Sequence, residues 1–239
     1  MARKIAVAMR KGGSGKTTTT VNLATALHER GRRVLLVDLD PQANATIAVG
    51  INPLEVKHNV NDLLTDDTIP AQAGITTTDF GMDVIPAHAD LARTEAGMQA
   101  AEIYALRELL APLEADYDYI VIDTPPSESF LTANALAYAT EVIIPLQAHY
   151  FAMEGLAQAA EQVTKVRAGL NPEIRVIGIL PTMVNPRTNI SKAVLDAARE
   201  AYPRTIYPFS VDFSVKHPEA TAAGVPIVLY EPGSTEPHI

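Results

Sequence analysis

Short apolar runs alternate with segments of helical periodicity along most of the chain. The runs at residues 5–9, 33–38 and 119–123 are apolar at nearly every position, which is typical of strands buried on both faces of a parallel sheet. Further strands are expected near residues 82–85, 141–145 and 175–180, and helices over residues 17–28, 90–98, 104–113, 129–139, 153–168 and 190–201. We therefore predict an α/β fold with a doubly wound, mostly parallel sheet and helices on both faces.

Length and composition suit one such domain over residues 1–239, with a short irregular tail from about residue 231. The 239 residues, 47 % of them hydrophobic, are enough to bury a large core. Cysteine is absent, which excludes disulfides and iron–sulfur clusters held by thiolates. No apolar run reaches the roughly 20 residues of a membrane-spanning helix, and no signal peptide precedes the first strand. We expect a cytoplasmic protein.

The most informative segment is a glycine-rich loop between the first predicted strand and the first predicted helix. It reads Lys11-Gly12-Gly13-Ser14-Gly15-Lys16-Thr17. Glycines allow a loop in this position to turn its backbone N–H groups toward phosphate oxygens, and the start of the helix adds positive charge. Lys16 is expected to reach the β- and γ-phosphates, and the Thr17 hydroxyl to bind Mg²⁺. The loop predicts nucleotide binding.

A carboxylate lies at the end of another predicted strand. Asp123 ends the apolar run at residues 119–123 and is followed by Thr124-Pro125-Pro126-Ser127. Because Mg²⁺ prefers octahedral oxygen ligands and keeps several waters, an acid at this place is suited to hold its water shell. The sequence thus predicts an Mg²⁺ site formed by Thr17 and Asp123.

These segments resemble the deviant Walker A ATPases of the ParA and MinD type, and the similarity runs from about residue 3 to about residue 232. In that family the lysine that opens the loop, here Lys11, reaches the partner's ATP across a sandwich homodimer. Residues 38–46 resemble the first switch segment, which implies that Asp40 orients the water attacking the γ-phosphate and that Asp38 lies near Mg²⁺ and Thr17. The resemblance implies an Mg²⁺-dependent ATPase, with Thr18 also in the nucleotide site.

The resemblance extends to the base and to DNA. Residues 181–189 resemble the loop that flanks adenine, so Met183 and Asn185 are assigned to the base, together with Pro208 farther on. Arg187 takes the place of an arginine that binds DNA without sequence specificity in chromosomal ParA proteins. Net charge is −9, but residues 165–216 hold eight basic and four acidic residues. We expect a weak, salt-sensitive DNA surface formed by Arg187, Lys192, Arg199, Arg204 and Lys216.

Two departures from the family pattern bear on function. Phe209 and Asp212 stand where the family commonly has arginines, and an aspartate repels phosphate. The tail at residues 232–239 has two prolines and no basic residue, which excludes the basic membrane-binding helix of MinD-type proteins. The pattern favours a nucleoid-associated DNA-partitioning ATPase without a membrane anchor, stimulated by a ParB-like centromere-binding partner.

Other classes remain open. An ATPase that positions a protein cluster could use the same switch and the same DNA surface, and only its partner would distinguish it. A metabolic synthetase shares the fold and the loop, although Lys11 and the Asp40 segment argue against it. The six histidines show no paired spacing and predict no metal site.

Overall fold

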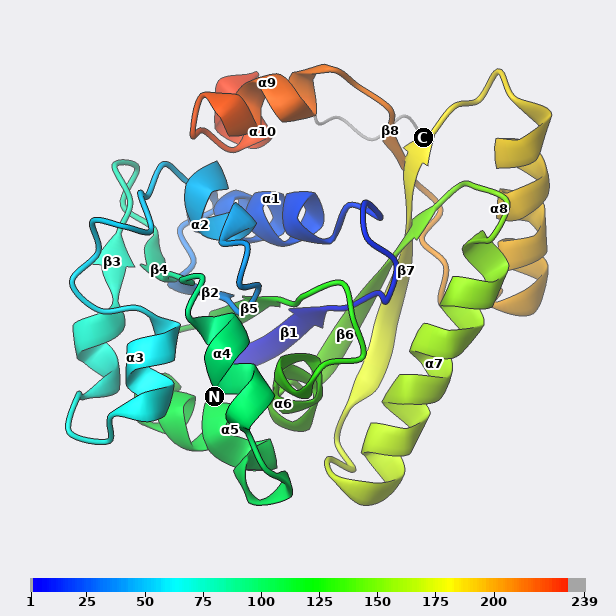
Figure 1. Cartoon of the computed structure of the whole chain (residues 1–239). Helices are drawn as coiled ribbons and strands as arrows, with labels where there is room; N and C mark the ends of the chain where they lie inside the picture. The colour runs from blue at the N-terminus through cyan, green and yellow to red at the C-terminus, as the bar shows by residue number, and fades with distance from the viewer. Residues whose placement is uncertain (1, 232–239) are drawn as a thin grey trace.

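The computed structural model describes residues 2–231 and contains an eight-stranded sheet in the order β3-β4-β2-β5-β1-β6-β7-β8 (Figure 1). All neighbouring strands are parallel except β3 and β4, which are antiparallel. The strands are β1 (Arg3–Val7), β2 (Val34–Asp38), β3 (Thr76–Thr77), β4 (Asp83–Ile85), β5 (Tyr119–Asp123), β6 (Glu141–Gln147), β7 (Arg175–Val184) and β8 (Val211–Asp212).

Helices cover both faces of this sheet, and a short helical segment lies at the end of the described chain, above α1 in Figure 1. The α-helices are α1 (Lys16–Glu29), α2 (Asn44–Ala48), α3 (Val60–Thr65), α4 (Leu91–Gly97), α5 (Ala105–Leu110), α6 (Phe130–Tyr138), α7 (Ala152–Gly169), α8 (Asn189–Ala201), α9 (Lys216–Ala222) and α10 (Ile227–Tyr230). Short 3₁₀ helices are η1 (Ala71–Gly74), η2 (Ala100–Tyr104) and η3 (Ala111–Leu113). The predicted α/β fold with a mostly parallel sheet is confirmed.

Successive residues of the central strands face opposite sides of the sheet, so each strand contributes to two cores. Leu35 and Ile120 belong to the larger core, which includes residues of α5, α6 and α7. Leu36 and Val121 belong to a second core, together with Val21 of α1. Because both faces are covered, these strands are apolar at almost every position, which is the pattern on which the prediction depended.

The register of the central strands brings three functional segments to one edge of the sheet. Asp123, the last residue of β5, is level with Val7 at the end of β1 and with Asp38 at the end of β2. In a parallel sheet the carboxyl ends of the strands lie together, and ligands bind outside them. The glycine-rich loop after β1 and the two aspartates therefore meet at this edge.

The predicted boundaries differ from the observed ones in places where the local chemistry interrupts a helix. The helix predicted over residues 104–113 is only six residues long as α5, because the chain tightens into η2 before it and η3 after it, and Pro112 lies in the first turn of η3. The predicted irregular tail, beyond residue 231, lies outside the described residues. No helix in residues 2–231 is both long enough and apolar enough to span a membrane.

Candidate nucleotide-binding site

The glycine-rich loop joins β1 to α1 and leaves the first turn of α1 facing a cavity. Gly13 and Gly15 have φ of 68° and 88°, in the left-handed region that favours glycine. Gly15 is the N-cap of α1 and offers no side-chain cap, so no side chain of its own occupies the N–H groups of the first turn. A helix start of this kind is suited to an anion.

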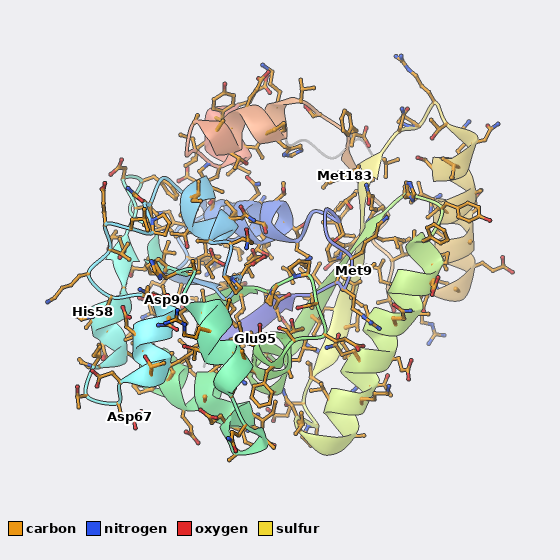
Figure 2. The ribbon with its side chains drawn as sticks, in the orientation of Figure 1. Met9, His58, Asp67, Asp90, Glu95 and Met183 are labelled. Atoms are coloured by element: carbon orange, nitrogen blue, oxygen red, sulfur yellow. The ribbon has the colours of Figure 1, made fainter. Side chains whose placement is uncertain are left out.

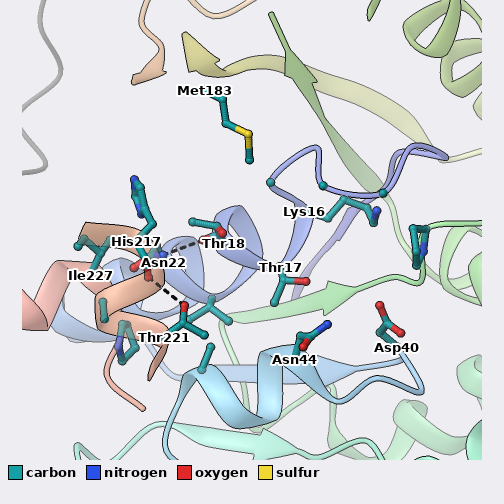
Figure 3. A pocket seen from close by; sticks show the side chains of 18 of the residues that line it. Lys16, Thr17, Thr18, Asn22, Asp40, Asn44, Met183, His217, Thr221 and Ile227 are labelled. Atoms are coloured by element: carbon teal, nitrogen blue, oxygen red, sulfur yellow. Dashed lines mark hydrogen bonds between the residues drawn. The ribbon is translucent and has the colours of Figure 1, made fainter. Parts of the chain in front are cut away.

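A cavity of about 330 Å³ runs from this loop to the segment that carries α9 and α10 (Figure 3). Lys16, Thr17 and Asp40 lie toward one end, whereas His217 and Ile227 lie toward the other. The same cavity is lined by Gly12, Gly13, Gly15, Thr18, Val21, Asn22, Asn44, Ala48, Pro126, Met183, Ala220, Thr221, Val225 and Pro226. A nucleotide has the same two-ended chemistry, with charged phosphates at one end and an apolar ring at the other.

The two lysines of the loop differ in where they lie. Lys16 is 6 % exposed and lines the cavity, and its Nζ donates a hydrogen bond to the Lys11 carbonyl oxygen at 3.3 Å. Burial lowers the pKa of Lys16, while Asp123 and Asp40 act in the opposite direction. An anionic ligand would therefore be bound more strongly by Lys16, because it would stabilise the charge of this partly desolvated cation. Lys11 is half-buried and does not line the cavity.

Asp123 is tied to α1 by two threonine hydroxyls. Thr17 Oγ1 donates to Asp123 Oδ2 at 2.7 Å, and Thr20 Oγ1 donates to Asp123 Oδ1 at 2.9 Å. Asp123 is fully buried, and this burial, with a further contribution from Asp38, raises its pKa to about 7. The predicted pair of Thr17 and Asp123 is thus in direct contact at the end of β5.

Asp38 and Asp40 have different surroundings, although they lie two residues apart. Asp38 is fully buried and accepts hydrogen bonds from the Thr46 backbone N–H and hydroxyl and from the Asp40 N–H, at 2.8–3.0 Å. Its carboxylate does not line the cavity and fixes the Asp40 segment against α2. Asp40 lines the cavity, and its Oδ1 accepts from the Gln42 N–H at 3.0 Å. Asp40 is therefore the acid that faces the cavity.

The residues around Thr17 suit a magnesium ion that binds together with a ligand. The charge of Asp40 raises the pKa of Asp38, the charges of Asp38 and Asp40 raise the pKa of Asp123, and Lys16 is the buried cation beside them. A divalent cation would offset this excess of negative charge. Within the described part of the chain, no three acidic or histidine side chains are placed to hold a metal by themselves. A site with one hydroxyl, indirect carboxylate support and ligand phosphates is the pattern Mg²⁺ prefers.

Of the residues assigned to the base, one lines the cavity. Met183 does so, whereas Asn185 and Pro208 are absent from its lining. Asn185 accepts the Arg187 backbone N–H through its Oδ1 at 3.1 Å, a contact within its own loop. Thr18 lines the cavity as expected. Ser14, in the loop itself, is buried outside the cavity lining, and its carbonyl oxygen accepts a hydrogen bond from the Thr182 hydroxyl at 2.8 Å.

The sequence did not point to the wall formed by α9 and α10. His217, Thr221 and Ile227 lie far along the chain from the loop and belong to no motif, so neither spacing nor periodicity could place them in the site. Asn22 and Val21, one turn into α1, could have been found, because they follow Thr18 on the same helix face.

The residues assigned to DNA fall into two places. Arg187 precedes α8, Lys192 and Arg199 lie on it, and Arg204 follows it, all of them exposed. Lys216 instead begins α9 and pairs with Glu219 at 3.0 Å. The two substituted positions, Phe209 and Asp212, lie on the connection to β8 and on β8 itself, and both side chains are exposed. Four of the five residues therefore lie on α8 or beside it, whereas Lys216 lies on a different helix, α9.

A family model, two curated proteins and a solved structure each match most of this chain. Residues 2–176 match the family model described as AAA domain. The chain is 40 % identical over 236 residues to the sporulation initiation inhibitor protein Soj of Bacillus subtilis, covering 98 % of this chain and 93 % of that protein. It is 41 % identical over 234 residues to the chromosome partitioning protein ParA of Myxococcus xanthus, covering 97 % and 82 %.

A solved structure is similar over almost the same length. A protein of Mycobacterium smegmatis described as cobyrinic acid a,c-diamide synthase superimposes with a TM-score of 0.84 and 38 % sequence identity, covering 94 % of this chain and 91 % of that one. That structure contains an ATP analogue and magnesium.

Proposed function

The chain belongs to the ParA/Soj family of P-loop ATPases, and from this membership we propose that it is an ATP-dependent switch for DNA segregation. In this proposal ATP closes a homodimer, the dimer binds DNA without sequence specificity, and slow hydrolysis, stimulated by a ParB-like partner, opens it again. The observation that carries the proposal is the different placement of two lysines of one loop. Lys16 lines the cavity and can bind the protomer's own nucleotide, whereas Lys11 lies outside the lining.

ATP and Mg²⁺ fit the residues at the phosphate end of the cavity. The loop N–H groups and Lys16 would hold the β- and γ-phosphates, and Thr17 with Asp123 would hold the ion. Bound Mg²⁺ would neutralise charge on the phosphates. Lys16 then stabilises the charge that builds up as the γ-phosphoryl group leaves.

Asp40 is the residue we assign to the water. Its carboxylate lines the cavity and is held by the Gln42 N–H, while Asp38 fixes the backbone at Asp40 itself. An acid held in this way can orient a water toward the γ-phosphorus, so that the bond to the bridging oxygen breaks and ADP and phosphate form. Asp38 acts on the segment and is a positioning residue.

Lys11 is the residue we assign to the homodimer. It lies on the same loop as the phosphate-binding glycines but outside the cavity lining, so its ammonium is available to the phosphates of a second nucleotide. Because a lysine lacks the planar fork of arginine, it gives weaker transition-state stabilisation, which is consistent with slow hydrolysis without a partner.

The DNA surface would be formed by α8 and its flanking loops. Arg187, Lys192 and Arg204 have no ion pair within residues 2–231, and Arg199 is paired with Asp196 at 3.6 Å on the same helix. A single protomer offers few phosphate contacts, so the binding depends on joining two such surfaces in one dimer. This would place the ATP-bound protein on the nucleoid.

The experiment that tests the function measures the solution mass and the binding to a labelled non-specific duplex, with no nucleotide, with ADP and with ATP, over a series of salt concentrations. We expect dimerisation and DNA binding only in the samples that contain ATP and Mg²⁺. The affinity for DNA should fall steeply as the salt concentration rises. Lys16→Ala should lose nucleotide binding. Lys11→Ala should bind ATP and stay monomeric, and Lys57→Ala, a change of an exposed lysine outside the cavity, should behave as wild type.

Two outcomes would redirect the assignment. A dimer that does not bind DNA would overturn the segregation role and favour a switch that acts on a protein or membrane scaffold. A protein that remains monomeric with ATP would favour a synthetase, in which ATP activates a small carboxylate.

Asp40→Ala should trap the ATP dimer on DNA, and normal hydrolysis by this variant would disprove the role of Asp40.

A further inference from the structure

Helix α2 lies between the cavity and the buried end of β2. Asn44 and Ala48 of this helix line the cavity, and Figure 3 shows Asn44 together with Asp40 at the end where Thr17 lies. Thr46, on the same helix, is fully buried instead. A helix of five residues has little stability of its own, so contacts to the surrounding elements must fix its place.

The Thr46 hydroxyl joins three segments of the chain. Its Oγ1 donates to Asp38 Oδ2 at 2.8 Å and accepts the Ala87 N–H at 3.0 Å. The Thr46 N–H donates to the same Asp38 oxygen at 2.9 Å. Asp38 ends β2, and Ala87 follows β4, which is the neighbour of β2 in the sheet. One hydroxyl thus connects α2 to the ends of two adjacent strands.

The second oxygen of Asp38 extends this connection to Asp40. Asp38 Oδ1 accepts the Asp40 N–H at 3.0 Å, so the backbone that carries the Asp40 carboxylate is bonded to a group that Thr46 holds. Asp38, Thr46 and Ala87 are all fully buried, where a polar group that loses its partner has no water to replace it. A continuous path of hydrogen bonds therefore leads from Ala87 to the acid that faces the cavity.

The turn between Asp40 and α2 is in an unfavourable backbone conformation. Ala43, the N-cap of α2, has a φ of 53°, in the left-handed region that favours glycine, and its N–H donates to the Asp40 carbonyl oxygen at 2.8 Å. Such a conformation persists where the surroundings enforce it. The bonds from Thr46 to Asp38 span this turn, so they are among the contacts that keep it closed.

The Ala87 end of the path lies outside the cavity lining. The carbonyl oxygen of the residue before Ala87 accepts the first N–H of α3 at 2.8 Å, and the chain then enters α4. Figure 2 shows Asp90 and Glu95, at the start of α4 and within it, on one side of the molecule and Met183 on the other. Thr46 is thus bonded to a part of the fold that is separate from the cavity wall formed by β7.

We propose that Thr46 is a positioning residue for ATP hydrolysis. Its hydroxyl holds Asp38, and through Asp38 it holds the backbone of Asp40, so that the Asp40 carboxylate is fixed where it can orient the attacking water. The inference rests on the proposed function and adds Thr46 to the residues on which the reaction depends. Because a misplacement of about 1 Å can slow a reaction a hundredfold, release of Asp40 should slow hydrolysis while Lys16 and the loop still hold the nucleotide.

The test compares single-turnover hydrolysis of ATP, with Mg²⁺ and the non-specific duplex, with calorimetric titration of ADP and Mg²⁺. Thr46→Val keeps the shape of the side chain and removes the hydroxyl, so hydrolysis should slow about tenfold or more while ADP affinity stays within about threefold of wild type. Thr46→Ser restores the hydroxyl and should hydrolyse ATP within about threefold of wild type.

The matched control is Thr25→Val. Thr25 is also fully buried, and its hydroxyl donates to the Val21 carbonyl oxygen of its own helix at 2.9 Å, outside the path to Asp40. This variant should hydrolyse ATP within about twofold of wild type. In the Asp40→Ala background, where the water-orienting carboxylate is absent, Thr46→Val should have no further effect on the residual rate.

Several results would overturn the inference while the proposed function stands. Wild-type hydrolysis by Thr46→Val would do so, and so would equal losses in Thr46→Val and Thr46→Ser, because the hydroxyl would then not be the group that matters. Equal loss of ADP affinity and of hydrolysis in Thr46→Val, or an equal effect of Thr25→Val, would indicate a purely structural role. A further loss in the Asp40→Ala background would show that Thr46 acts by another path. A wild-type protein that binds ADP and does not hydrolyse ATP would instead refute the proposed function, and this inference with it.

Discussion

Two aspartates, Asp38 and Asp123, are fully buried at the ends of neighbouring strands, and neither forms an ion pair within residues 2–231. Burial raises the pKa of Asp38 to about 6 and that of Asp123 to about 7, and hydrogen bonds from Thr46, Thr17 and Thr20 limit the effect. The nucleotide-free site is therefore short of positive charge. This lack of positive charge lowers the stability of the nucleotide-free fold, and it favours the binding of a cation together with a ligand.

The nucleotide-free protein should lose stability as pH rises from about 4 to about 7. Both folded-state pKa values lie above the value of about 3.9 for an unfolded aspartate, so in this window the folded state holds protons that the unfolded state has released. The stability from these groups is complete at low pH and is lost as pH rises through their folded pKa values. Thermal melts without nucleotide should give a Tm several degrees lower at pH 7.5 than at pH 5.5.

The control for this prediction is Asp123→Asn, which keeps the shape of the side chain without its charge. The fall in Tm between pH 5.5 and pH 7.5 should be smaller in this variant than in wild type, because one of the two raised groups is gone. Equal slopes in the two proteins would contradict the idea that Asp123 is protonated in the nucleotide-free fold.

For single residues, the sequence alone predicted a place in the site where the residue belongs to a local motif or ends a predicted strand. Lys16 and Thr17 stand beside glycines, and Asp123 ends an apolar strand, so their places followed from local rules. Asp38 could not be assigned in the same way, because its partner Thr46 lies eight residues later on α2. His217 is a lone histidine with no motif around it, and only the fold brings it to the cavity.

Among the elements, the long periodic or uniformly apolar ones were predicted, whereas the short elements α2, α3, α9, α10, β3 and β8 were not. Strand β5 has the predicted bounds, and α1 differs from its prediction by one residue at each end. Helices α2, α9 and α10 have four to seven residues and give a weak periodic pattern, and proline or glycine lies within or beside each of them. Their positions depend on tertiary contacts, notably the approach of Gly50 to Gly224.

Gly224→Ala should displace α9 and α10, which line the cavity, and weaken nucleotide binding. Gly224 has a φ of 66°, and a Cβ there would lie 3.0 Å from the Gly50 Cα, so alanine meets both backbone strain and a rigid neighbour. We expect a destabilisation of about 1–3 kcal/mol and several-fold weaker ADP binding, with pyrophosphate binding unchanged. Thermal melts and calorimetry measure the two effects. Gly97→Ala, on α4 with open space around it, should change neither. Wild-type ADP affinity in Gly224→Ala would show that this contact does not position the cavity wall formed by α9 and α10.

For the molecule as a whole, charge is distributed unevenly. The net charge of −9 opposes DNA binding over most of the surface, while α8 and its flanking loops lie at one edge of the fold and carry exposed arginines and a lysine (Figure 1). A surface with so few cations binds DNA weakly in one copy. Two copies in an ATP-closed dimer would bind more tightly because the second contact is made at high effective concentration.

Arg187→Glu tests this arrangement. Arg187 is exposed in the loop before α8, and the structure gives its side chain no ion pair within residues 2–231, so the change should leave the fold, ATP binding and dimerisation intact. Each dimer would lose two cations and gain two anions, and we expect DNA affinity to fall at least tenfold at low salt, with a shallower dependence on salt. Arg32→Glu is the control for net charge alone, because it reverses the same charge at another exposed arginine. Arg32 lies just before β2, at the amino end of the strand, whereas the cavity lies at the carboxyl ends. If the two variants lose affinity equally, DNA responds to total charge and α8 is not its surface; if Arg187→Glu alone loses it, the contact lies at α8.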